Sequence, residues 1–219
     1  MKQINLNNWF LNLVLNKYFD DKENNSKLAY KFGQVFKAEL KTIEYKDEQT
    51  YICSVSDYMM KNIKYTPDPL LFDYYTHPEL LQKMIDTNDY SRYGADCDDM
   101  ACYAYSQLSK HIDKNKLTVV SIIPDLIANI SDIQWCHVVA VGLFSLRWSD
   151  GWSYIYTIDT NGLNWYQFKL DSYQDVSIDD LLNFKVSGAD KQVKDLILDR
   201  FSGIYSTKYK LLINHGYPF

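Results

Sequence analysis

Apolar residues in the first half of the chain recur every three or four positions, as they do on one face of a helix. Near the N-terminus, Leu6, Trp9, Phe10 and Leu13 form such a stripe. The same spacing predicts helices over residues 28–36, 48–63 and 96–110, and a short helix after Pro78. The first half of the chain is therefore expected to be mostly helical.

The second half carries runs that are typical of β-strands, namely residues 117–123, 133–146, 152–159 and 163–170. The run at 133–146 is apolar on both faces, which indicates a central strand that is covered on both sides. Two helices are predicted after the strands, near residues 178–184 and 190–201. Helices followed by a run of strands predict an α+β fold built on an antiparallel sheet.

Length and charge limit the domain organisation and the classes of function that the chain can have. The 219 residues suffice for one domain with an appendage. We divide them into an N-terminal helical extension, residues 1–45, and a core with C-terminal helices, residues 46–219. The net charge of −5 and the lack of a Lys/Arg cluster argue against nucleic-acid binding. The apolar runs are too short for a membrane span, and the N-terminal stretch is interpreted as an amphipathic helix rather than a signal peptide.

Four cysteines, Cys53, Cys97, Cys102 and Cys136, are few for a chain of this length. We expect free thiols in a reducing compartment, and hence a cytoplasmic protein, or a virion protein if a phage encodes it. Three of these cysteines and His137 add up to four potential zinc ligands. Zinc is disfavoured because Cys97 and Cys102 point about 140° apart around their helix, and neighbours on a strand face opposite ways.

The stretch YGADCDDMACYAYSQL, residues 93–108, places Cys97 at the start of a predicted helix. Asp96 suits the N-cap position, and Asp99 completes a pattern like a capping box. Free N–H groups and the helix dipole favour a thiolate at the first helical position, and the same N–H groups suit an oxyanion. Asp98 and Asp99 oppose the thiolate by repulsion, so a nearby cation or base is required.

A candidate base and a group to orient it follow on the predicted strands. His137 lies near the start of the strongest strand run, and Asp159 ends the next one. An imidazole can exchange a proton with a thiol, and a third group can orient it. A loop over residues 145–151 puts His137 directly opposite Asp159, and we favour this register. A tight Asp-Gly turn at 150–151 would instead put Gly142 opposite Asp159.

Each candidate also has a structural interpretation. Cys97 suits a small buried residue at a helix start, His137 suits a core histidine, and Asp159 suits a cap of the turn that follows it. Trp135 and Tyr93 are weaker candidates for the oxyanion site or the substrate groove. Both are aromatic residues that commonly serve only as packing.

The fragments ADCDDMA, HVVAV and IDTNG, with IKYTPDP upstream, resemble the transglutaminase-like superfamily of papain-related folds. Bacterial and phage members carry a G-D-C-D-D-x-A stretch at the nucleophile helix, then a strand histidine and a strand aspartate. The resemblance runs from about residue 50 to residue 165. It implies a nucleophile helix packed on an antiparallel sheet, with Cys97 as nucleophile, His137 as general base and acid, and Asp159 as the orienting residue.

Together these features predict a cysteine-dependent amide hydrolase or acyltransferase, of protease, deamidase or transglutaminase type, that forms an acyl-thioester. The substrate is expected to be a protein or peptide, and no metal or organic cofactor is expected. The alternative is a non-catalytic structural or assembly protein, such as a phage virion component, that keeps the fold and binds a partner through its N-terminal helix. A zinc-stabilised binding module is a third interpretation.

Overall fold

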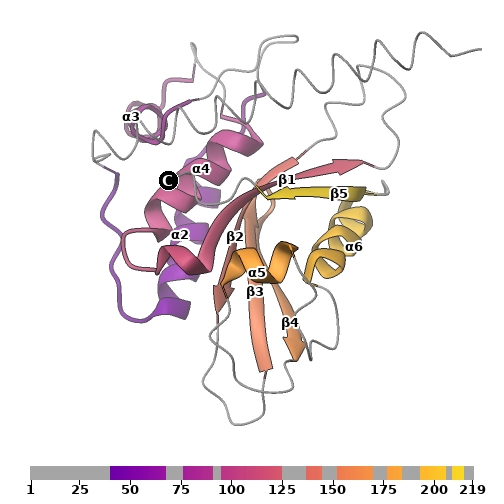
Figure 1. Ribbon diagram of the computed structural model, residues 1–219. Helices are drawn as coiled ribbons and strands as arrows, with labels where there is room; N and C mark the ends of the chain where they lie inside the picture. Colours follow the sequence, from indigo (N-terminus) through magenta and orange to yellow (C-terminus); the bar gives the residue numbers. More distant parts are fainter. Residues whose placement is uncertain are drawn as a thin grey trace, which may run out of the picture.

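The computed structural model describes residues 40–67, 76–90, 95–124, 137–144, 152–169, 177–183, 193–205 and 209–214. Within these ranges the strands are β1 (Leu117–Pro124), β2 (His137–Phe144), β3 (Trp152–Asp159), β4 (Gly162–Lys169) and β5 (Tyr209–Asn214). They form one antiparallel sheet in the order β4-β3-β2-β1-β5 (Figure 1). The predicted α+β class and the four predicted strands are confirmed.

Strand β5 was not predicted. It pairs with β1 at one edge of the sheet. Its six residues, YKLLIN, are too few for hydrophobic periodicity to separate a strand from the end of the preceding helix. The last predicted helix is therefore followed by one further strand that completes the sheet.

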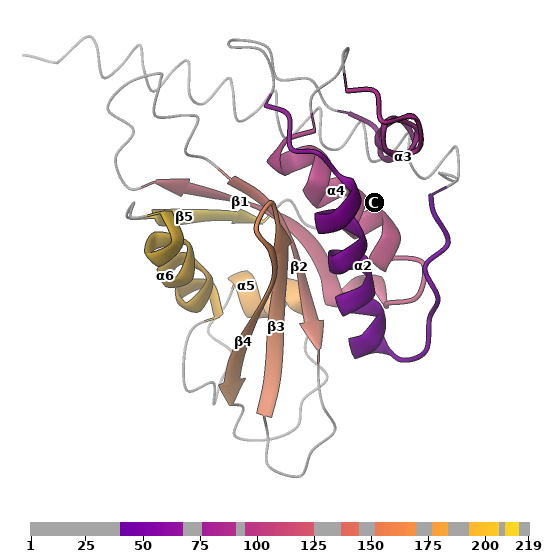
Figure 2. The ribbon, with the colours of Figure 1, turned by 180° about the vertical axis from the view of Figure 1, so that it is seen from behind.

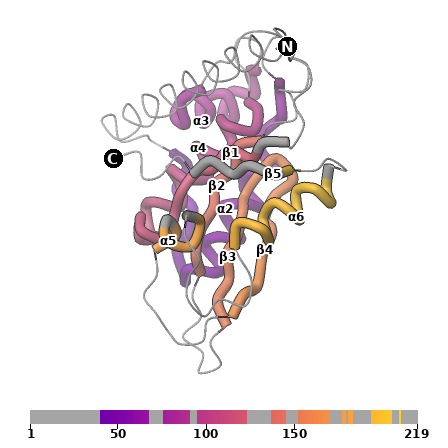
Figure 3. The backbone as a smooth tube through the Cα atoms, turned by 45° about the vertical axis from the view of Figure 1, so that its right-hand side comes forward, coloured from indigo at the N-terminus to yellow at the C-terminus, as the bar shows by residue number. Residues whose placement is uncertain are grey.

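The helices are α2 (Glu48–Asn62), α3 (Pro78–Thr87), α4 (Cys97–Leu108), α5 (Ile178–Asn183) and α6 (Val193–Tyr205), with a 3-10 turn η1 (Lys114–Lys116). All five α-helices were predicted, whereas the helices expected before residue 40 lie outside the described residues. Helices α2 and α4 cover one face of the sheet, and α5 and α6 cover the other (Figures 1 and 2). Helix α3 packs on α4 (Figure 3).

Strand β2 is buried on both faces, as the sequence predicted. Val138 and Ala140 point toward α2 and α4, in a cluster that we call the front core. Val139 and Val141 point toward α5 and α6, in the back core. Because successive strand residues face opposite sides, the position of any β2 side chain in the sequence fixes the core that it joins.

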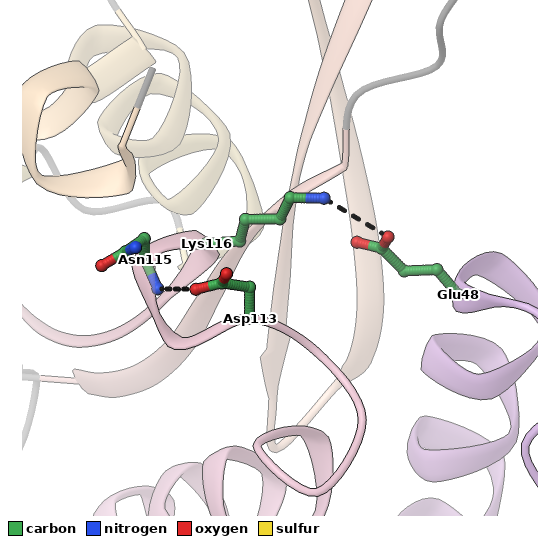
Figure 4. A network of polar contacts seen from close by, with 4 residues as sticks. All are labelled: Glu48, Asp113, Asn115 and Lys116. Atoms are coloured by element: carbon green, nitrogen blue, oxygen red, sulfur yellow. Dashed lines mark hydrogen bonds and ion pairs between the residues drawn. The ribbon is translucent and has the colours of Figure 1, made fainter. Parts of the chain in front are cut away.

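An ion pair connects α2 to the turn before β1. The Lys116 ammonium lies 3.5 Å from a Glu48 carboxylate oxygen, and Asp113 accepts a hydrogen bond of 2.8 Å from the Asn115 N–H within the turn (Figure 4). Both charged side chains are partly exposed, so the pair adds at most about 1 kcal/mol. None of the helices in the described ranges has the length and apolar character to cross a bilayer.

Candidate active site around Cys97

Cys97 is the first residue of α4 and is half-buried beside the front core. Asp96 is the N-cap, and its Oδ1 accepts a hydrogen bond of 3.4 Å from the Asp98 N–H. In return, Oδ2 of Asp99 accepts one of 3.2 Å from the Asp96 N–H. The predicted capping box is confirmed, and it fixes the thiol at the N-terminal end of the helix dipole.

Two neighbouring segments hold the start of α4 in place. The Thr76 N–H, just before α3, donates to Oδ1 of Asp99 at 2.6 Å. Ala95 and Thr66 exchange two backbone hydrogen bonds, of 2.8 and 3.1 Å, in an isolated antiparallel bridge. Both oxygens of the buried Asp99 carboxylate therefore bind backbone N–H groups, and the chain before Cys97 is tied to the segment that follows α2.

Two carboxylates lie close to the thiol. Ligand-type atoms of Asp96, Cys97 and Asp98 all lie within 4.8 Å of one another. Two carboxylates and a thiol are few ligands for a hard cation, which prefers six or more oxygen atoms, and the Asp96 carboxylate already serves the helix cap. The nearby negative charge opposes a thiolate, so nucleophilic chemistry at Cys97 needs a positive group close by.

His137 does not supply that group in this arrangement. Its ring centroid lies 6.3 Å from that of Phe201 and 6.1 Å from that of Tyr209, both in the back core. The imidazole thus faces α6, on the opposite side of the sheet from α4 and Cys97. Burial lowers the pKa of His137 to about 4, which leaves the ring neutral at neutral pH.

The register between β2 and β3 is the reason that His137 and Asp159 are not directly opposite each other. Gly142 pairs with Tyr156, and Ala140 pairs with Ile158. The register that we favoured is wrong by two residues, and the alternative with Gly142 opposite Asp159 is wrong as well. A slip of two residues leaves every side chain on the same face, so the hydrophobic pattern alone does not reveal it.

Asp159 is a buried turn cap. Its Oδ1 accepts a hydrogen bond of 2.7 Å from the Asn161 N–H, so Asp159 caps the turn that follows it. Its Oδ2 is buried and has no hydrogen-bond partner among the described residues. Burial raises the pKa of Asp159 to about 6, although the hydrogen bonds from Asn161 and the charge of Arg200 act to lower it. Alternation along β3 places its side chain on the back face, away from Cys97.

A second imidazole lies on the α4 side. His77 is the N-cap of α3, next to the residue that binds Asp99, and its Nδ1 accepts a hydrogen bond of 3.3 Å from the Glu79 N–H. Burial lowers its pKa. Sequence reasoning missed it because histidine is not among the preferred N-cap residues. The other two candidates, Trp135 and Tyr93, lie outside the described residues.

The structure therefore brings the thiol and its helix cap together, and places His137 and Asp159 on the far face of the sheet.

The sequence and the structure were also compared with known proteins. No protein family, no curated protein and no solved structure matches the chain.

Proposed function

We propose that the chain is a cysteine-dependent amide hydrolase or acyltransferase with Cys97 as its nucleophile, on a transglutaminase-like, papain-related core. The observation that carries this proposal is the position of the thiol. Cys97 is half-buried at the first position of α4, and Asp96 and Asp99 are both committed to the helix cap. A central helix packed on an antiparallel sheet is also what the resemblance implies for the nucleophile helix.

The chemistry follows from that position. The Cys97 sulfur attacks an amide carbonyl carbon, and backbone N–H groups at the start of α4 stabilise the oxyanion. An imidazole takes the thiol proton and returns it to the departing amine. The acyl-thioester then passes to water, which gives hydrolysis, or to a second amine, which gives transfer. The free thiol is regenerated in both cases.

The proposal requires His137 to turn toward α4 in the catalytic state. His137 is the terminal residue of β2 and pairs with Ile122 of β1. Strand β3 begins to pair with β2 only at Ala140. Turning the side chain therefore disturbs the pairing of one residue with β1 and leaves the β2–β3 ladder intact.

Alkylation kinetics test the proposal in the full chain. Iodoacetamide labelling of each cysteine is followed by mass spectrometry as a function of pH. Cys53 is the internal reference, because burial and two nearby carboxylates, Asp57 and Asp47, raise its pKa. We expect Cys97 to react more than about tenfold faster than Cys53 at neutral pH. His137→Gln removes this advantage, whereas His111→Gln, at a site stacked on Tyr45, keeps it.

Two results contradict this assignment. Cys97 labelling that is no faster than Cys53 labelling removes the nucleophile. A fast reaction that survives His137→Gln and is lost in His77→Gln keeps the nucleophile but assigns the base to the imidazole on the α4 side.

A second candidate is a non-catalytic structural or assembly protein. The observation in its favour is the aromatic setting of His137, whose neutral ring packs near Phe201 and Tyr209 on the far side of the sheet. On this view Cys97 is labelled no faster than Cys53 at any pH tested, and His137→Gln changes the labelling rate of Cys97 by less than about twofold.

A further inference from the structure

Two buried glutamines bind the main chain of the segment that precedes α2. Oε1 of Gln82, on α3, accepts a hydrogen bond of 2.9 Å from the Lys41 N–H. Nε2 of Gln107, on α4, donates one of 3.0 Å to the Lys41 carbonyl. The Lys110 ammonium donates to the Leu40 carbonyl at 3.4 Å. Three consecutive polar groups of the backbone thus bind side chains rather than other backbone groups.

Surrounding side chains orient the whole amide of Gln82 and the NH2 group of Gln107. The Tyr103 hydroxyl donates to Oε1 of Gln82, whose Nε2 donates to the Tyr58 hydroxyl at 3.0 Å and to Asp86 at 2.9 Å. Nε2 of Gln107 also donates to the Tyr103 hydroxyl at 3.1 Å. Both glutamines are almost completely buried. The Gln82 acceptor and the Gln107 donor that bind residue 41 are therefore prearranged before the segment docks, which lowers the entropic cost of binding.

The segment is anchored by Leu40, and two later side chains add contacts: Ile43 packs on the front core, and the Tyr45 ring stacks on His111 at a centroid distance of 4.7 Å. Leu40 is only 7% exposed and belongs to the front core, whereas the side chains of Lys41 and Thr42 are exposed. Residues 40–45 form no helix or strand. The recognition thus combines backbone hydrogen bonds with a few apolar side chains of the segment, which is how extended peptides are commonly bound.

We propose that the surface formed by α2, α3 and α4 is a peptide-recognition groove, occupied in cis by Leu40–Lys41, that accepts the same segment from a second copy of this chain. The hydrogen bonds and the buried site of Leu40 match this segment, and its release dissolves no regular element. A segment joined directly to α2 has an effective concentration of about millimolar, so the cis contact dominates in dilute solution. Exchange between two chains creates a dimer without any new kind of contact. This inference does not depend on the chemistry of Cys97.

The test uses full-length variants and a fluorescein-labelled peptide with the sequence of residues 38–46, AELKTIEYK, followed by fluorescence polarisation. The wild-type protein should not bind the peptide, because its own segment fills the groove. Leu40→Asp places a carboxylate in an apolar site, releases the segment and should produce saturable binding. Thr42→Asp adds the same charge at an exposed position and should behave like the wild type.

Specificity is tested in the Leu40→Asp background. Adding Gln82→Ala and Gln107→Ala removes two hydrogen bonds to the peptide and should weaken binding by about thirtyfold. The same peptide with its leucine changed to aspartate should not bind. Lys41→Pro, which deletes the N–H that binds Gln82 but keeps Leu40, provides a second and milder way to release the segment.

Circular dichroism confirms that each variant is folded. A folded Leu40→Asp or Lys41→Pro protein that fails to bind the peptide overturns the proposal. So does binding to Thr42→Asp that equals binding to Leu40→Asp. If neither release variant folds, the segment is an indispensable part of the core and not an exchangeable ligand, which also overturns the proposal.

Discussion

At the scale of single residues, His137 and Asp159 carry opposite pH dependences. Burial lowers the folded-state pKa of His137 from 6.5 to about 4, so the unfolded chain binds a proton between these values that the folded protein does not, and stability is lost as the pH falls. Burial raises the pKa of Asp159 from 3.8 to about 6, so the folded protein keeps a proton that the unfolded chain has released, and stability is lost as the pH rises through that window.

We expect the two contributions to separate in single variants. His137→Phe removes the group that takes up a proton on unfolding, so it should be more stable than the wild type at about pH 4. We expect a gain of about 2 kcal/mol, which is less than the full pKa shift implies because the wild-type imidazole is partly accessible to solvent. Asp159→Asn keeps an oxygen for the Asn161 N–H and should gain about 2 kcal/mol at about pH 7. Urea denaturation of all three proteins across this range measures both effects. Free-energy curves that run parallel to the wild type would show that these residues do not titrate as described.

The parts of the candidate site that depend on residues close in sequence were predictable, whereas the parts that depend on tertiary contacts were not. The capping box involves Asp96 and Asp99, three positions apart, and its geometry follows from helix structure alone. The face that His137 presents depends on how β2 pairs with its neighbours. The resemblance implied an imidazole over the thiol, whereas alternation along β2 and the contact with Phe201 place it on the other side.

At the scale of elements, the β2–β3 pairing depends on one glycine. Gly142 pairs with Tyr156, and a Cβ on Gly142 would overlap the Tyr156 ring, which is fully buried. Moving the pairing by two residues, to the register that we favoured, sets that ring against Ala140. A strand glycine opposite a large aromatic residue is therefore the sequence signal that selects the true register.

Gly142→Ala should destabilise the protein by about 3 kcal/mol, because the added methyl group has no space. Gly203→Ala is the matched control. A Cβ at this position in α6 meets no atom of the described residues within 4 Å, and alanine is the better helix former, so we expect a gain of about 0.5–1 kcal/mol.

Chemical denaturation gives both values. A double variant, Gly142→Ala with Tyr156→Ala, should lose less than the sum of the two single losses, because removal of the ring makes room for the methyl group. Additive losses would show that the glycine and the ring do not interact.

At the scale of the whole molecule, one sheet separates two cores. The sequence predicted a central strand with both faces covered, because an apolar run without alternation has no solvent face. It did not predict that α4 lies on one side and His137 on the other. The helices of the two cores meet the sheet independently, so a change in one core should leave the local environment in the other intact.

Phe201→Ala and Met59→Ala test this separation. Each removes a fully buried side chain, Phe201 from the back core and Met59 from the front core, and each should cost about 3–5 kcal/mol of stability. Only Phe201→Ala should raise the pKa of His137 toward 6.5, since it admits water to the imidazole.

An NMR titration of the histidine ring protons measures that pKa in both variants. An equal change in the two proteins would mean that the loss of stability, rather than the neighbouring ring, controls the imidazole.

The way in which Gln82 and Gln107 hold residue 41 has a consequence for sequence drift in this protein. Because the two glutamines bind only the backbone N–H and carbonyl of residue 41, they exert no selection on the side chain at that position. Neutral substitution should therefore accumulate at Lys41 and Thr42, while Leu40 and the two glutamines stay fixed over the same evolutionary interval.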